Sequence, residues 1–180
     1  MYVYELAKEH RALLVNVEHR FYGESYPTST MTTDNLQYLS SQQALADLAR
    51  IITYLKNSLD TQSSRVIVVG GSYPGNMAAW FRQLYPHITV GAIASSAPLI
   101  AQTNFYGYME VVASSIETMA AADTGKACNA ALESAAIAVS QLLESPEGMQ
   151  QLSTDFKTCA PLNSTADASI LLSDLMGNIQ

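Results

Sequence analysis

Apolar residues recur along the first hundred positions with two alternating periods, one typical of helices and one typical of buried strands. Helical spacing is found in three stretches, namely Tyr2–Arg11, Leu45–Leu55 and Met77–Leu84. Three short runs predict strands, namely Ala12–Val17, Arg65–Val69 and Val90–Ala94. The first is nearly continuously apolar, which suits a parallel strand covered on both faces, and the second is rich in β-branched residues. Because helices and strands alternate, the pattern predicts an α/β fold with a parallel sheet.

From about Asn104 onward the pattern changes. The apolar positions there predict only helices, around Tyr108–Met119, Ala131–Leu143, Leu152–Phe156 and Ile170–Leu175. No strand is evident in this part of the sequence. We therefore expect residues 1–104 to form an α/β core and residues 105–180 to form a helical segment attached to it.

Two local signals refine the first part of the pattern. Ser40 precedes the second predicted helix, and Gln43 lies three residues after Ser40. This spacing predicts a reciprocal capping box. The stretch Glu18–Thr33 is rich in Gly, Ser, Thr and Pro, so we expect a loop there.

The composition limits the classes of function. The 180 residues carry a net charge of −7 and no cluster of Lys or Arg, which argues against nucleic acid or an anionic membrane surface as a partner. No apolar run reaches the ~20 residues needed to span a bilayer. The first residues lack the basic and apolar regions of a signal peptide, so the chain is either cytosolic or begins inside a longer protein.

The strongest chemical signal is the run Gly70–Gly75, which joins a predicted strand to a predicted helix. This context is typical of the nucleophile elbow of α/β-hydrolases, in which a serine hydroxyl projects from a sharp bend. The strained bend needs small neighbours, and Gly70 supplies one on the strand side. We therefore predict that Ser72 is a catalytic nucleophile.

Pro74 occupies the place where the usual G-x-S-x-G pattern has its second glycine, and Gly75 keeps the next position small. Proline is tolerated in the first turn of a helix, where a backbone N–H has no intrahelical partner. The N–H of Tyr73 is intact, so we predict it as an oxyanion donor, supported by the positive end of the helix dipole. Gly71 completes the predicted bend.

A glycine-rich turn between a strand and a helix can also bind phosphate or simply turn the chain. The β-branched strand before Ser72 and the amphipathic helix after it favour the nucleophile. The local pattern alone leaves the other interpretations open.

The loop after the first predicted strand reads Glu18-His19-Arg20-Phe21-Tyr22-Gly23-Glu24-Ser25. Three further stretches follow in order, namely Tyr38–Leu48, Gly70–Arg82 and Tyr85–Pro98. Together the four stretches resemble the motifs of the proline-directed serine peptidases, the family of lysosomal Pro-X carboxypeptidase, dipeptidyl peptidase II and thymus-specific serine protease.

The resemblance implies a serine-type exopeptidase that cleaves proline-containing peptides next to proline, with a Ser–Asp–His triad and without a cofactor. It implies a partial α/β-hydrolase core over residues 1–104 and a truncated helical cap, similar to the SKS domain of the family, over residues 105–180. It also implies a secretory, lysosomal or extracellular parent protein, and members of this family can form homodimers.

Cys128 and Cys159 have no histidine neighbours, so we expect no metal site there. From the residues alone, two buried thiols are one interpretation, and a disulfide that closes a loop of about thirty residues is the other. The resemblance favours the disulfide, because the cap of the family carries one. The triplet Asn163-Ser164-Thr165 is a glycosylation acceptor sequence, which matters only in a secretory compartment.

A complete triad is not found in the sequence. Triads of α/β-hydrolases run Ser, Asp, His along the chain, and the only histidines are His10, His19 and His87. His87 follows the helix that begins at Ser72, so it lies roughly 15 Å or more from the serine, whereas a general base must lie within ~3 Å. We expect His19 to order the loop around it, and the chain to be a fragment.

Three functions stay open on this basis. The leading one is a serine exopeptidase that is active only within a longer chain. The second is a catalytically inactive fragment or pseudoenzyme that retains peptide binding. The third is an esterase or lipase on the same fold, which the Glu18–Ser25 signature disfavours.

Overall fold

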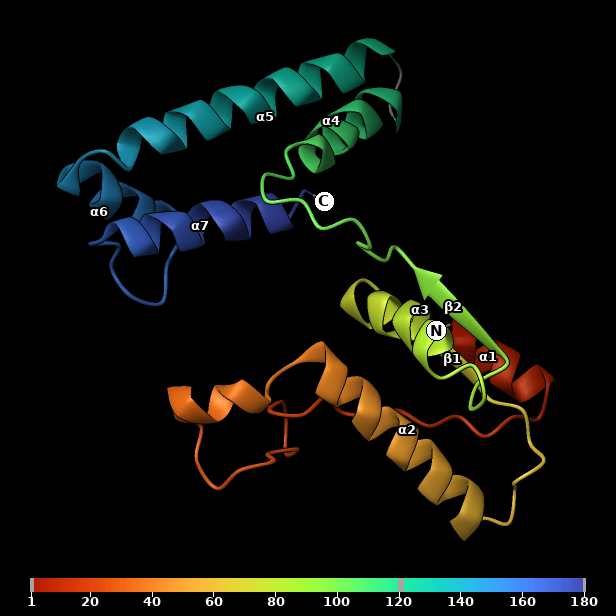
Figure 1. Cartoon of the computed structure of the whole chain (residues 1–180). Helices are drawn as coiled ribbons and strands as arrows, with labels where there is room; N and C mark the ends of the chain where they lie inside the picture. The colour runs from red at the N-terminus through yellow and green to blue at the C-terminus, as the bar shows by residue number, and fades with distance from the viewer. Residues whose placement is uncertain (1, 120–121, 180) are drawn as a thin grey trace. The chain divides into compact units, whose positions relative to one another are not determined.

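The computed structural model describes residues 2–119 and 122–179, with the backbone alone at residues 122 and 123. The chain divides into two compact units, Met1–Ala101 and Gln102–Gln180. Helices and a small parallel sheet form the described part of the first unit, and helices form the regular structure described in the second (Figure 1).

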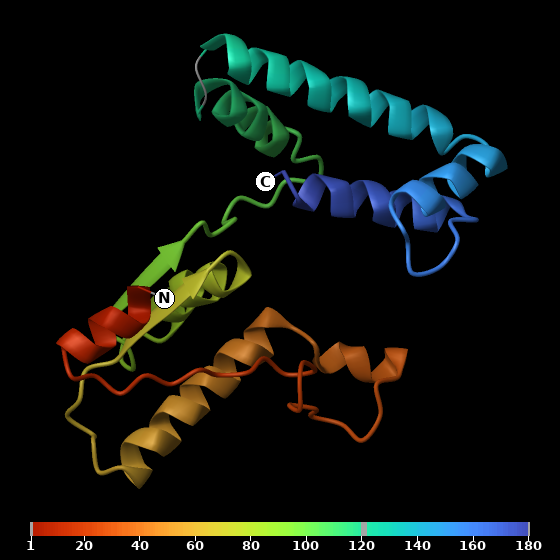
Figure 2. The ribbon, with the colours of Figure 1, turned by 180° about the vertical axis from the view of Figure 1, so that it is seen from behind.

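The first unit is built around two parallel strands and the helix that connects them. Its elements are, in chain order, α1 (Tyr2–Glu9), the 3₁₀ helix η1 (Thr33–Tyr38), α2 (Ser41–Ser58), β1 (Ile67–Gly71), α3 (Tyr73–Leu84) and β2 (Gly91–Ser95). Strand β1 pairs with β2, with Ile67 opposite Gly91 and Gly71 opposite Ser95. Helix α3 packs on both strands and α2 packs on α3, as seen from two opposite sides (Figure 1, Figure 2).

The core of this unit forms where α2 meets α3. Leu45 and Ala49 of α2 are buried against Phe81 of α3, whose side chain is fully enclosed. Burial of such a phenylalanine contributes about 2–3 kcal/mol. Partly buried apolar residues surround the cluster, namely Leu48, Ile52, Val68, Met77, Trp80, Tyr85 and Ile88. The core thereby holds α3, whose N-cap is Ser72, in a fixed position against β1.

The strand predicted over Ala12–Val17 is not formed. These residues are irregular and have no β partner among the described residues, and Leu13 is 70% exposed. A strand requires a neighbour that takes up its N–H and C=O groups, and β1 and β2 pair with each other. The prediction of a third strand is therefore wrong for this structure, because apolar character alone does not supply a pairing partner.

The start of α2 confirms Ser40 as the N-cap, since its hydroxyl accepts a hydrogen bond from the Gln43 N–H at 3.3 Å. The reciprocal half of the predicted capping box is not made. The Gln43 side chain instead accepts a hydrogen bond from Arg20 and donates one to the Gln37 carbonyl. A tertiary contact has replaced the local one.

The second unit contains the helices α4 (Gly107–Met119), α5 (Ala122–Leu142), α6 (Pro146–Asp155) and α7 (Thr165–Gly177). Helix α5 packs on both α4 and α6. Leu143, Leu152 and Leu171 are buried together and form the core. Ser145 caps α6 and Ser164 caps α7, each hydroxyl accepting a backbone N–H three residues later. The helices predicted from Tyr108 onward are confirmed.

The predicted disulfide between Cys128 and Cys159 is not formed, and both are exposed free thiols. Cys128 lies in the second turn of α5, about 20 Å along the helix from Leu142 at 1.5 Å per residue. Cys159 follows α6, which begins just beyond the C-terminal end of α5. The two cysteines thus belong to different parts of the second unit, and each is a free thiol rather than half of a disulfide.

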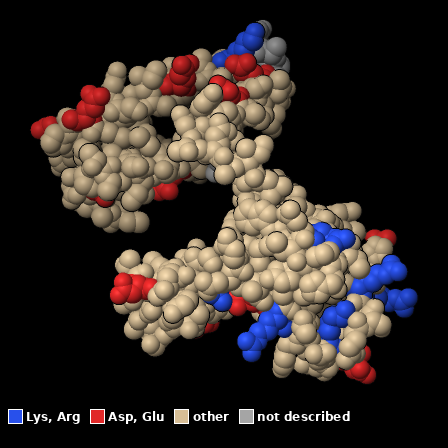
Figure 3. Space-filling model, viewed as in Figure 1, with Lys and Arg blue, Asp and Glu red and all other residues tan. Residues whose placement is uncertain are grey.

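The charges are distributed unevenly between the two units. Lys126 and Lys157 are the only basic residues of the second unit, which carries the acidic excess of the chain. Lys and Arg side chains gather over the first unit in the view of Figure 3. No helix in the described residues is both long and apolar enough to cross a membrane.

Candidate active site

Ser72 is the single residue between β1 and α3. Its backbone has φ 57° and ψ −130°, a conformation that costs a residue other than glycine about 1–3 kcal/mol. The residue is exposed, and its hydroxyl does not cap α3. A strained serine presented at a strand-to-helix bend is the geometry of a nucleophile elbow.

Close backbone packing explains two of the glycines at the bend. A Cβ on Gly70 would lie 2.7 Å from the Gly75 nitrogen and closer still to the carbonyl of Pro74. A Cβ on Gly75 would lie 2.9 Å from the Ser95 carbonyl oxygen. A Cβ on Gly71 would meet only that same oxygen, at 3.9 Å, which is an ordinary contact. The bend thus requires small residues at positions 70 and 75, whereas position 71 has room.

Tyr73 and Pro74 are the first two residues of α3. The N–H of the first helical residue has no intrahelical acceptor, so the Tyr73 amide can donate to an atom beside the Ser72 hydroxyl. Pro74 lacks an N–H but stands where none is needed. The positive end of the α3 dipole adds to the attraction for a negative charge at this point.

Hydrogen bonds within α3, to the end of β2 and to the turn after β2 fix the bend. The Ser72 N–H donates to the Ser95 carbonyl at 2.9 Å, and the Ser72 carbonyl accepts from the Asn76 N–H at 3.1 Å. The Asn76 side chain is buried and donates to the Pro98 carbonyl at 3.0 Å. Sequence reasoning missed Asn76, although a polar residue in the first turn of an otherwise apolar helix was a usable signal.

The signature Glu18–Ser25 forms a closed loop. The Glu18 carboxylate accepts hydrogen bonds from the Ser25 hydroxyl at 2.7 Å and from the Glu24 N–H at 3.0 Å. These two donors, the hydroxyl first, hold the pKa of Glu18 below its ordinary value. Gly23 has φ +55°, and a Cβ there would collide with the Glu18 carboxylate. The loop therefore depends on glycine at position 23.

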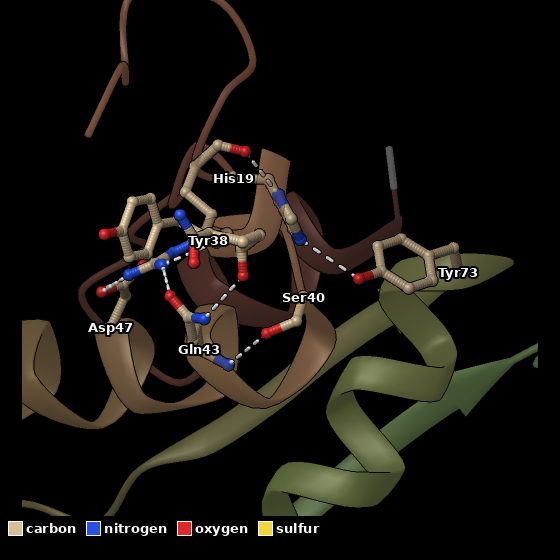
Figure 4. A network of polar contacts seen from close by, with 8 residues as sticks. His19, Tyr38, Ser40, Gln43, Asp47 and Tyr73 are labelled. Atoms are coloured by element: carbon tan, nitrogen blue, oxygen red, sulfur yellow. Dashed lines mark hydrogen bonds and ion pairs between the residues drawn. The ribbon is translucent and has the colours of Figure 1, made fainter. Parts of the chain in front are cut away.

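Arg20 ties this loop to α2. Its guanidinium binds both carboxylate oxygens of Asp47, at 2.7 and 2.8 Å, and donates to the Tyr38 carbonyl at 2.8 Å and to Gln43. The hydrogen bonds with Asp47 raise the pKa of Arg20. Figure 4 shows Tyr38, Gln43 and Asp47 converging on one point. This two-pronged pairing is the geometry in which arginine binds a carboxylate most strongly.

The loop also reaches the elbow through His19. Its Nε2 atom lies 3.1 Å from the Tyr73 hydroxyl, and its Nδ1 atom lies 2.8 Å from the Arg20 carbonyl (Figure 4). The Tyr22 ring meets the His19 ring edge-on, with centroids 5.4 Å apart. The signature loop and the predicted nucleophile, far apart in the sequence, thus belong to one site.

The described residues bring no general base to the Ser72 hydroxyl. Both ring nitrogens of His19 are engaged with other partners. His87 lies beyond the 12 residues of α3, a helix about 18 Å long at 1.5 Å per residue. Among the described residues no three His, Cys, Asp or Glu side chains gather as metal ligands would.

Comparison with known proteins places this chain in a family. A family model described as Serine carboxypeptidase S28 matches residues 2–180. The chain belongs to the serine carboxypeptidase S28 family. The resemblance inferred from the Glu18–Ser25 signature and the three stretches after it is thereby confirmed.

Similar members of the S28 family have names that agree with this assignment. The chain is 46% identical over 162 residues to prolyl carboxy peptidase like protein 5 of Caenorhabditis elegans, covering 87% of this chain and 31% of that protein. It is 40% identical over 172 residues to mouse thymus-specific serine protease, covering 94% and 34%. It is 36% identical over 170 residues to human lysosomal Pro-X carboxypeptidase, covering 91% and 33%.

The chain spans about a third of the length of the curated relatives it matches. These homologues are serine peptidases, and hence hydrolases, by name.

Proposed function

We propose that Ser72 is the nucleophile of a serine peptidase that cleaves peptides next to proline. One observation carries this proposal. Ser72 is exposed at a strand-to-helix bend, has a strained backbone with a positive φ, and is followed directly by the first amide of a helix. Membership of the S28 family and a relative named lysosomal Pro-X carboxypeptidase support the choice of substrate.

The proposed fold follows from the same bend. Residues 1–104 would be the nucleophile-bearing part of an α/β-hydrolase fold, with β1, α3 and β2 as its central elements. Residues 105–180 would be part of a helical cap. The secretory or lysosomal location belongs to this proposal too, supported by the relatives named lysosomal and by the exposed acceptor Asn163.

In the proposed reaction the Ser72 Oγ attacks the carbonyl carbon of the scissile peptide bond while its proton passes to a base. The carbonyl oxygen becomes negatively charged and accepts a hydrogen bond from the Tyr73 N–H. Collapse of this intermediate breaks the C–N bond while the base gives its proton to the departing amine, and an acyl group remains on Ser72. Water then gives a proton to the base and attacks this ester, which releases the carboxylic acid and restores the Ser72 hydroxyl. We assign the base and the acid to none of these 180 residues, since His87 is the only histidine after Ser72.

No residue in the described part of the chain brings a base to the elbow, which favours a second candidate, a protein that binds peptides without turning them over. Both ring nitrogens of His19 are occupied and α3 separates His87 from the elbow. This candidate predicts saturable peptide binding and no product. It shares the elbow geometry and differs only in the presence of a base in the whole protein.

Covalent labelling tests the nucleophile in the full-length protein that contains these residues. A fluorophosphonate should label the wild type, and Ser72→Ala should abolish the label. Ser96→Ala is the matched control, because Ser96 is exposed and also has a positive φ, of 49°, but lies after β2; its label should persist. Label retained in Ser72→Ala would refute the assignment.

Turnover separates the remaining candidates. We expect hydrolysis of a short peptide with an internal proline to exceed hydrolysis of a short acyl ester. Peptide binding without product would favour the non-catalytic candidate, and preferential ester hydrolysis would favour an esterase. Analysis of the released fragment, one residue from the carboxyl end or a dipeptide from the amino end, assigns the direction of cleavage.

A further inference from the structure

The Tyr73 side chain is held at its tip by two segments that are distant in the sequence. Its hydroxyl lies 3.1 Å from His19 Nε2 and 3.0 Å from Ser41 Oγ. His19 comes from the signature loop, and Ser41 is the first residue of α2. The residue whose N–H is the proposed oxyanion donor is therefore fixed at both ends, by its backbone in α3 and by its hydroxyl.

The direction of these hydrogen bonds follows from the chemistry of the partners. The Arg20 carbonyl can only accept, so the His19 Nδ1 atom that lies 2.8 Å from it carries a hydrogen. In a neutral imidazole the other nitrogen is then an acceptor. In that tautomer Nε2 accepts the Tyr73 O–H, which leaves the Tyr73 oxygen able to accept the Ser41 O–H. The resulting chain runs from Ser41 through Tyr73 and His19 to the Arg20 carbonyl.

Both ends of this chain rest on α2. Ser41 belongs to α2 directly. His19 is tied to it through its neighbour Arg20, which binds Asp47 in the second turn of α2. One helix therefore sets the position of both groups that hold the tyrosine ring.

We propose that His19 and Ser41 are positioning residues that keep the Tyr73 N–H aimed at the developing oxyanion, an inference that rests on the proposed nucleophilic role of Ser72. The strained backbone of Ser72 persists only if its surroundings fix it. Hydrogen bonds to Ser95 and Asn76 fix the Ser72 peptide groups. The Ser72 carbonyl and the Tyr73 N–H belong to one planar peptide unit, so the bond from Asn76 helps to orient this N–H, and the hydrogen bonds at the Tyr73 hydroxyl add a second constraint on the same residue.

Loss of the hydrogen bonds at the Tyr73 hydroxyl should lower kcat, because the Tyr73 N–H binds the transition state more strongly than the substrate. Loss of a whole oxyanion donor lowers kcat by about 10²–10³-fold. A donor that is still present but less well aimed should lower kcat by about tenfold, with KM changed less than twofold. Both Tyr73→Phe, which removes the hydroxyl alone, and His19→Ala should show this pattern.

Two further variants distinguish positioning from general stability. His19→Gln supplies one donor and one acceptor and should restore kcat to within about threefold of the wild type. The double variant His19→Ala/Tyr73→Phe should lose less than the product of the two single losses, because both substitutions remove the His19–Tyr73 hydrogen bond, although each also removes one further contact. Unfolding curves of all variants are recorded alongside.

The experiment uses the full-length protein, with fluorophosphonate labelling of Ser72 measured beside peptide turnover. An unchanged kcat, a rise in KM alone, or additive losses in the double variant would each overturn the positioning role. If His19→Ala does not fold, Tyr73→Phe decides, since it leaves the ring in place. Wild-type protein in which Ser72 takes no label refutes the proposed function and this inference together, whereas normal labelling with unaffected variants refutes this inference alone.

Discussion

Substitution of Gly70 by alanine is a direct probe of how tightly the bend at Ser72 is packed. The new Cβ would lie 2.7 Å from the Gly75 nitrogen and closer to the Pro74 carbonyl. These are backbone atoms of α3, which cannot rotate aside as a side chain would. Overpacking in a well-packed site costs about 1–3 kcal/mol, and we expect Gly70→Ala to lie at the upper end, about 3 kcal/mol.

Gly71→Ala is the matched control one residue away. Its Cβ would meet only the Ser95 oxygen, at 3.9 Å, and Gly71 is not among the residues with positive φ. Alanine in a strand is favoured over glycine by about 0.5–1 kcal/mol, so this variant should be as stable as the wild type or slightly more stable. The two variants should differ by about 3–4 kcal/mol in the free energy of unfolding.

Urea denaturation of the full-length protein, followed by circular dichroism, measures the difference, and the rate of fluorophosphonate labelling reports the bend itself. Gly70→Ala should lower both the unfolding midpoint and the labelling rate, while Gly71→Ala should leave both near the wild-type values. Equal stability of the two variants would contradict the close approach of β1 to the start of α3 at Gly70.

Other predictions concern the signature loop and the second unit. Arg20→Lys keeps the charge but loses the two-pronged contact with Asp47, so urea unfolding should show a loss of about 1–2 kcal/mol, whereas Arg50→Lys, exposed on α2, should show none. The pKa of Glu18 is held below its ordinary value of 4.5, so the ionised carboxylate stabilises the fold above pH 4.5, and this contribution is lost as the pH falls further. Glu18→Gln should therefore make the stability of the protein depend less on pH in this acidic range. An unchanged pH dependence would contradict the loop hydrogen bonds. Asn163→Gln should remove a glycan that glycosidase treatment detects in secreted protein. Ser164→Ala should keep that glycan but lose about 1 kcal/mol of α7 capping, and loss of the glycan there would count against the assignment.

Features that depend on neighbouring residues could be predicted from the sequence. The β-branched run before Gly70 and the amphipathic pattern after Ser72 are sufficient to locate β1, α3 and the bend between them. The Ser40 cap and the helices after Asn104 follow from similarly local signals. In each of these cases the residues that determine the structure lie within a few positions of it.

Features that depend on residues far apart in the sequence could not be predicted from it. Arg20 and Asp47 are 27 residues apart and His19 and Tyr73 are 54 apart, so no periodicity indicates that they meet. The apolar run Ala12–Val17 favours a strand, but a strand forms only when a neighbour pairs with it. The spacing of the two cysteines in the sequence likewise does not indicate whether the fold brings them together.

The most direct test of the central claim is a crystal structure of the full-length protein after reaction with a fluorophosphonate. Our interpretation predicts a phosphorus atom bonded to the Ser72 Oγ, with one phosphonyl oxygen about 2.7–3.1 Å from the Tyr73 nitrogen. An adduct on another residue, or a phosphonyl oxygen turned away from the Tyr73 amide, would contradict it.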